Sequence, residues 1–97
     1  MYKKISKGDK DKQHTSLLEK QMYILEILKK NPDGLSKGFL WREAQHRLGR
    51  SAYETAINMA MSSRRLEFRN LKQEDGRIKS VYLITSKGLD ALKNYNS

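Results

Sequence analysis

The sequence predicts an α+β domain, mainly α-helical with one small β-hairpin, in which three helices are followed by two strands and a final helix. Three patterns lead to this prediction. Apolar residues recur at intervals of three and four in three stretches of the first two-thirds of the chain, a spacing that places them on single helix faces. Two strand-like runs, 66–71 and 78–84, flank an Asp75-Gly76 pair that strongly favours a hairpin turn. A last apolar stripe, ending near Tyr95, predicts a short C-terminal helix.

Length, charge and residue usage narrow the classes of protein to which the chain can belong. Its 97 residues fit one domain. With 20 Lys+Arg against 11 Asp+Glu, the net charge is +9, which attracts polyanions such as nucleic acid or an anionic membrane surface. No apolar run is long enough to span a bilayer, so no membrane role is expected. Because the chain has no Cys, disulfide and thiolate-metal frameworks are excluded, and we expect a cytoplasmic protein.

The chain divides into a basic arm and one domain. Residues 1–14 are rich in Lys and have almost no apolar side chain after Ile5, so we expect a flexible arm there. Such an arm either is a solvated tail or follows DNA phosphates and enters a minor groove, as homeodomain arms do. Residues 15–97 form the expected folded domain.

The first two predicted helices have clear start and stop signals. Thr15 or Ser16 caps the first helix, which ends before the turn formed by residues 31–34, because proline cannot continue a helix and glycine permits the reversal. Ser36 caps the second helix, which is expected to run to Leu48 and to end at a glycine.

The third predicted helix, 51–63, has one apolar and one polar face. It is expected to open with a capping box. In this motif the Ser51 hydroxyl accepts a hydrogen bond from the amide of residue 54, and the Glu54 side chain accepts one from the amide of Ser51. The core face holds Tyr53, Ala56, Ile57 and Ala60. The opposite face holds Ser51, Thr55, Asn58, Ser62 and Arg65, with Met59 and Glu54 at its margins.

Two segments carry a family resemblance. Residues 48–51, Leu-Gly-Arg-Ser, resemble the turn of a helix-turn-helix, in which a Leu-Gly pair ends one helix and a serine caps the next. Residues 82–88 resemble the Tyr-x-Leu-Thr-x-x-Gly end of the wing in small PadR- and MarR-type regulators. The resemblance covers about residues 16–95. It implies a winged helix-turn-helix fold and a homodimeric DNA-binding transcription regulator, such as a repressor, that is associated with the nucleoid when bound.

The resemblance assigns roles to the polar and basic residues. In this fold the third helix enters the major groove and reads base edges. The residues expected on its DNA-facing side are Arg50, Ser51, Glu54, Thr55, Asn58, Ser62 and Arg65. The wing, residues 66–84, is expected to contact the minor groove or the backbone through Arg69, Lys72, Arg77 and Lys79. Further backbone contacts are expected from Lys37, Arg42 and Arg47. Because the middle of the third helix lacks Arg and Lys, base readout should be limited or lean towards A·T pairs.

Other functions remain open at this stage. A protein-interaction module would bind through an apolar surface around Trp41 or Tyr95, since folds of this kind are reused for many roles. A plasmid or viral replication, partition or architectural factor would share the DNA site. Trp41 and Tyr82 are expected to be core or interface aromatics rather than stacking platforms for single strands. No catalytic constellation is evident, and His14 and His46 are isolated, so we expect no enzymatic activity, cofactor or metal.

Overall fold

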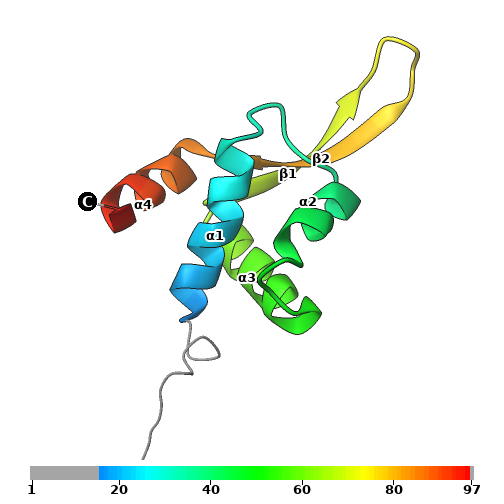
Figure 1. Ribbon diagram of the computed structural model, residues 1–97. Helices are drawn as coiled ribbons and strands as arrows, with labels where there is room; N and C mark the ends of the chain where they lie inside the picture. Colours follow the sequence, from blue (N-terminus) through cyan, green and yellow to red (C-terminus); the bar gives the residue numbers. More distant parts are fainter. Residues whose placement is uncertain (1–15, 97) are drawn as a thin grey trace, which may run out of the picture.

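The computed structural model describes residues 16–96 of the chain and contains four helices and one antiparallel pair of strands (Figure 1). The elements are α1 (Leu17–Lys29), α2 (Lys37–Ala44), α3 (Arg50–Ser62), β1 (Leu66–Lys72), β2 (Ile78–Ile84) and α4 (Ser86–Asn96). This order and the mixed α+β class are as predicted. The predicted basic arm, residues 1–14, lies outside the described residues.

Helix α1 forms the centre of the core. Its first turn is fixed by a capping box, because the Glu19 amide donates to the Ser16 hydroxyl over 3.1 Å and the Ser16 amide donates to the Glu19 carboxylate over 3.3 Å. Ile24, Leu25 and Leu28 are fully buried, and the helix packs against α2, α3, α4 and β2. The apolar spacing of α1 therefore positions every other helix.

Helix α2 ends earlier than the sequence predicts. It stops at Ala44 rather than at Leu48, and the amides of Arg47 and Leu48 both donate to the Ala44 carbonyl at 3.0 Å. The Glu43 carbonyl, which would accept the next helical bond, instead accepts from the Tyr23 hydroxyl of α1 at 3.2 Å. This contact between distant segments replaces the last helical turn, while Leu48 still reaches the core.

Helix α3 begins without the predicted capping box. Gly49 is the N-cap and makes no side-chain cap bond, and the first helical bond joins the Tyr53 amide to the Gly49 carbonyl at 2.9 Å. Ser51 therefore lies within the first turn. Glu54 does not reach back to the backbone of Ser51, because its carboxylate pairs with Arg50 one helical turn away.

The connection after α3 uses a left-handed residue. Arg64 has φ 61°, the one positive φ among the described non-glycine residues. The Arg65 amide then donates to the Ala60 carbonyl at 2.8 Å, which closes the helix end. This turn directs the chain into β1 without the glycine that usually occupies such a position.

Strands β1 and β2 pair in antiparallel register, with Phe68 opposite Tyr82. Leu35 adds an isolated bridge to the other edge of β2, through bonds of 3.1 and 2.8 Å with Tyr82. Only Gly76 has a positive φ in the predicted Asp75-Gly76 turn, at 89°. The Gly76 amide donates to the backbone carbonyl of Gln73 at 3.0 Å, so the turn is longer than the two-residue type.

Helix α4 is attached at the point where α3 meets β1. The Thr85 hydroxyl caps α4 by accepting from the Gly88 amide at 3.0 Å, and it donates to the Arg64 carbonyl at 2.6 Å. Leu92 is buried, whereas Leu89 and Tyr95 of the same predicted stripe are 42% and 44% exposed. Within the part of the chain that the structure describes, no helix is long and apolar enough to cross a membrane.

Candidate nucleic-acid interface

Helix α3 presents the polar face that the sequence predicts. Its buried side is formed by Tyr53, Ala56, Ile57 and Ala60. The opposite side is exposed and holds Ser51, Thr55, Asn58 and Ser62. Figure 1 shows the hairpin extending beyond the helices at the end where α2 begins, while the base of β1 follows the end of α3. An exposed polar helix beside a projecting hairpin is a shape that fits the major groove of duplex DNA.

Arg65 does not belong to this face, contrary to the prediction. It follows the end of α3, and its Nη1 donates to the Gln21 Oε1 of α1 at 3.2 Å. Gln21 is only 4% exposed, and the Arg65 Nε is buried with no partner among the described residues. The helical spacing fails at this position because the left-handed Arg64 turns the chain back towards α1.

Arg50 is held in place by three neighbouring side chains. Its Nε donates to Glu54 at 3.0 Å, and its guanidinium lies 4.9 Å from the Trp41 ring centre and 5.7 Å from the Tyr53 ring centre. Trp41 and Tyr53 are themselves tilted rings 5.0 Å apart. These contacts join α2 to α3 and fix the direction of the guanidinium.

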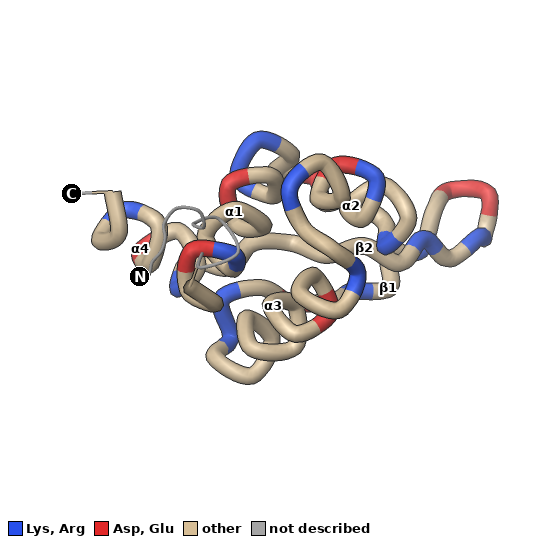
Figure 2. Tube along the Cα trace, turned by 60° about the horizontal axis from the view of Figure 1, so that its bottom comes forward, with Lys and Arg blue, Asp and Glu red and all other residues tan. Residues whose placement is uncertain are grey.

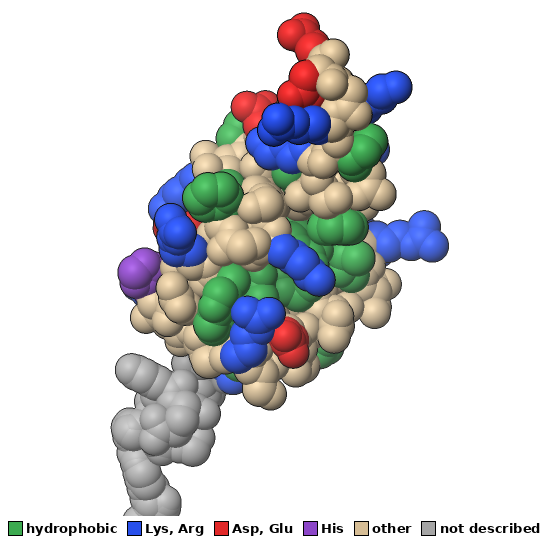
Figure 3. Space-filling model, turned by 90° about the vertical axis from the view of Figure 1, so that its right-hand side faces the viewer, with side chains coloured by type: hydrophobic (Ala, Val, Ile, Leu, Met, Phe, Trp, Pro, Cys, Tyr) green, Lys and Arg blue, Asp and Glu red, His purple; other side chains and the backbone are tan. Residues whose placement is uncertain are grey.

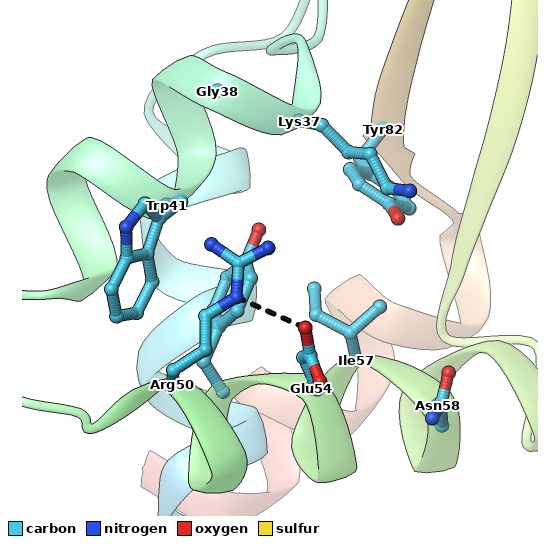
Figure 4. Close-up of a pocket in the computed structure, with 9 residues that line it drawn as sticks. Lys37, Gly38, Trp41, Arg50, Glu54, Ile57, Asn58 and Tyr82 are labelled. Carbon is cyan, nitrogen blue, oxygen red and sulfur yellow. Dashed lines mark hydrogen bonds and ion pairs between the residues drawn. The ribbon is translucent and has the colours of Figure 1, made fainter.

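A pocket of about 440 Å³ lies between α2, α3 and β2 (Figure 4). We call it the α2–α3 pocket. Its lining residues are Lys37, Gly38, Trp41, Arg50, Tyr53, Glu54, Ile57, Asn58 and Tyr82. The structure thus brings together four residues that are predicted from the sequence to contact DNA: Lys37, Arg50, Glu54 and Asn58. Figure 3 views the molecule from this side and shows exposed hydrophobic side chains with Lys and Arg side chains beside them.

Two tyrosines line this pocket and are otherwise buried. Burial raises the pKa of Tyr53 to about 12; the neighbouring Tyr82 adds to this rise and Arg50 opposes it. Burial also raises the pKa of Tyr82. Both phenols therefore keep their protons at neutral pH and can donate hydrogen bonds. The sequence predicts that Tyr53 lies in the core but does not predict the pocket, because the pocket needs Tyr82 of β2, which no local pattern places beside α3.

The three residues of α2 and the following turn that are predicted to contact the DNA backbone do not lie together. Lys37 lines the α2–α3 pocket. The guanidinium of Arg42 lies over Phe39 at 5.4 Å, and that of Arg47 lies over Tyr23 of α1 at 5.3 Å. Arg42 and Arg47 are exposed but do not line the pocket.

The basic residues of the hairpin do not form one patch. The register places Arg69 and Lys79 on one face of the ribbon, and Lys72 lies on the other face with Tyr82. Arg69 pairs with Glu67 at 3.2 Å.

The tip of the hairpin is acidic. Figure 2 shows acidic residues there, which the sequence identifies as Glu74 and Asp75. Asp75 pairs with Arg77 at 3.3 Å. By contrast, Lys72 and Lys79 have no ion-pair partner within residues 16–96.

No group of three or more His, Cys, Asp or Glu side chains that could hold a metal ion occurs within residues 16–96.

Comparisons of the chain with protein-family models, with curated proteins and with solved structures gave no match.

Proposed function

We propose that this protein binds double-stranded DNA as a winged helix-turn-helix module, with α3 in the major groove and the hairpin against the neighbouring backbone. The exposed polar face of α3 beside the projecting hairpin is the observation that carries the proposal. Helix α3 is a regular α-helix of 13 residues, and an α-helix about 10–12 Å in diameter fits a major groove about 12 Å wide. The pairing of Leu35 with β2 adds a third strand segment at the base of the hairpin.

Charge supports the same role and refines it. The net charge of +9 attracts the phosphate backbone. Three predicted DNA-contacting arginines pair with carboxylates, but these pairs are exposed, and exposed pairs contribute only about 0–1 kcal/mol, so phosphates can replace them. Glu74 and Asp75 at the tip oppose its entry into a minor groove. We therefore assign the hairpin contact to Arg69 and Lys79, nearer its base, rather than to Arg77.

Base readout would come from the middle of α3. Asn58 can bind adenine through two hydrogen bonds. The hydroxyl groups of Ser51, Thr55 and Ser62 can either donate a hydrogen bond to a base edge or accept one from it. This set favours A·T-rich sites over G-rich ones. A sequence-dependent binder of this kind would act as a transcription regulator, such as a repressor, in the cytoplasm on nucleoid DNA.

A homodimer is part of the proposal. Exposed apolar side chains lie on α1 and α4: Leu18 and Leu89 are each 42% exposed, and Tyr95 is 44% exposed. Pairing of these helices with those of a second copy would place two α3 helices on successive half-sites of a palindrome.

The proposal is tested by fluorescence anisotropy with a random duplex and with the region upstream of the protein's own coding sequence, each at a low and a higher salt concentration. We expect binding to both duplexes at low salt, a steep loss at higher salt, and tighter binding to the specific region. Equal, weak and salt-independent binding to both would contradict it.

One observation favours a second function, a protein-interaction module. Phe68 and Ile78 lie on the same face of the hairpin and are 40% and 61% exposed. An exposed apolar ribbon with an acidic tip suits a protein partner better than DNA. For such a module, replacing Arg77 and Lys79 with Ala would leave partner binding intact, whereas Ile78→Asp would abolish it.

A further inference from the structure

Two tyrosine hydroxyl groups at the α2–α3 pocket have no hydrogen-bond partner among the described residues. Tyr53 and Tyr82 are only 5% and 7% exposed, and neither hydroxyl has a hydrogen-bond partner among residues 16–96. Their rings are buried, but their hydroxyl oxygens are not among the fully buried polar atoms that lack a partner, so both oxygens are accessible to solvent. Both tyrosines line the same pocket. A molecule that fills this pocket can therefore accept hydrogen bonds from two phenols that have no partner among the described residues.

Two positive charges face the same space. Lys37, Arg50 and Tyr82 all line the pocket, and Figure 4 shows the Lys37 ammonium and the Tyr82 hydroxyl towards one end of it and the Arg50 guanidinium towards the other. Only the Nε of Arg50 is engaged by Glu54, so its terminal nitrogens remain available as donors. Lys37 has no ion-pair partner among the described residues. The pocket thus combines donors from two cations and two phenols with a single carboxylate.

We propose that the α2–α3 pocket binds a phosphate group. A phosphate offers several acceptor oxygens and a negative charge, which match the donors of Lys37, Arg50 and the two tyrosines. Trp41 and Ile57 supply an apolar wall. At about 440 Å³ the pocket is larger than a phosphate alone and lies in the range of pockets for small organic ligands. A phosphate that is carried by a sugar or a ring therefore fits this space.

Such a phosphate has two sources, a free nucleotide or a DNA strand, and the second source rests on the proposed function. A free nucleotide would occupy Lys37 and Arg50 and so compete with duplex DNA for the same face. Binding of a small phosphorylated molecule would then release DNA without any change in fold.

The first arm of the test uses the fluorescence of Trp41, the only tryptophan in the chain, with the full protein and no DNA. The probes are AMP, inorganic phosphate and adenosine. If the source is a free nucleotide, AMP and phosphate change the signal with saturation and adenosine does not. Tyr82→Phe and Lys37→Ala then weaken AMP binding about tenfold each. Lys87→Ala, an exposed lysine on α4, binds AMP as the wild type does.

The second arm measures duplex binding by the same four proteins. If AMP and phosphate do not bind but Tyr82→Phe and Lys37→Ala weaken duplex binding several-fold more than Lys87→Ala, the phosphate belongs to DNA. The proposal is overturned if neither ligand binding nor duplex affinity depends on Tyr82 and Lys37, which would mean that water alone fills the pocket. Absence of duplex binding at low salt counts against the proposed function, and the AMP arm then decides on the pocket by itself. Should Tyr82→Phe fail to fold, the exposed Lys37→Ala variant gives the answer in both arms.

Discussion

The guanidinium of Arg50 lies 4.9 Å from the centre of the Trp41 ring and donates through Nε to Glu54 at 3.0 Å. The first residue of α3 is thereby fixed against α2, and its charge is partly neutralised within the candidate interface. Arg50 lies where the sequence predicts a DNA contact, and its terminal nitrogens remain available as donors, but the Glu54 carboxylate beside it repels a phosphate.

Removing the Glu54 charge should therefore strengthen DNA binding. We expect Glu54→Gln to raise the affinity for a random duplex about two- to fivefold at low salt, because a repulsive carboxylate is lost and Arg50 is freed. Anisotropy titration measures this change. The matched control is Asp90→Asn, which removes one negative charge from exposed α4. An equal gain in both variants would show that only net charge matters and that Glu54 has no special position.

Arg64 carries backbone strain that glycine would relieve. Its φ of 61° costs a non-glycine residue about 1 kcal/mol, so Arg64→Gly should raise the free energy of unfolding by about that amount. Urea denaturation provides the measurement. Ser63→Gly is the control, since Ser63 has an ordinary φ of −88° and should lose about 0.5–1 kcal/mol. Destabilisation by Arg64→Gly would mean that the arginine side chain outweighs the strain.

Gly88 leaves no room for a side chain. A Cβ at this position would overlap the Arg65 carbonyl oxygen and crowd Ile84. We expect Gly88→Ala to lower the free energy of unfolding by about 2 kcal/mol or more, because backbone rather than a flexible side chain must move. By contrast, Gly38 in α2 has open space around it, and Gly38→Ala should stabilise by about 0.5–1 kcal/mol. A neutral Gly88→Ala would contradict the close approach of α4 to the end of α3.

Stability should fall at high pH because of the tyrosines. The pKa of Tyr53 is raised from 10.0 to about 12 in the folded protein, so the folded state holds the proton more tightly than the unfolded state. This contribution is fully present below pH 10 and is lost as the pH rises towards 12. Urea denaturation at pH 9, 10 and 11 should show the decline, and Tyr53→Phe should reduce it. A decline of the same size in Tyr53→Phe would assign the effect to other groups.

Much of the fold was predictable because its signals are local. The Ser16 cap of the first helix and the Asp75-Gly76 turn each lie within a few residues and were found where expected, although the turn is of a longer type. The capping box that was predicted at Ser51 and Glu54 is absent. The polar face of α3 followed from helical spacing alone. These features need no knowledge of the tertiary structure.

The features that were missed depend on contacts between distant segments. Arg65 turns inward to Gln21, which is 44 positions away in the sequence. Tyr23 of α1 takes the carbonyl that would have extended α2. The α2–α3 pocket requires Tyr82 of β2 to meet two helices. No short sequence pattern predicts contacts of this kind. A local pattern can predict that a tyrosine is buried, but it does not show whether the hydroxyl faces the core or a cavity.

The central claim is that the basic groups beside α3 bind DNA phosphates, and the salt dependence of duplex affinity tests it most directly. For the wild type, the logarithm of the association constant should fall linearly with the logarithm of salt concentration, by about 0.9 for each neutralised phosphate. Lys79→Ala should lower this slope by about one such step, and Lys87→Ala on α4 should leave it unchanged. A flat salt response in the wild type, or an equal change in both variants, would contradict the claim.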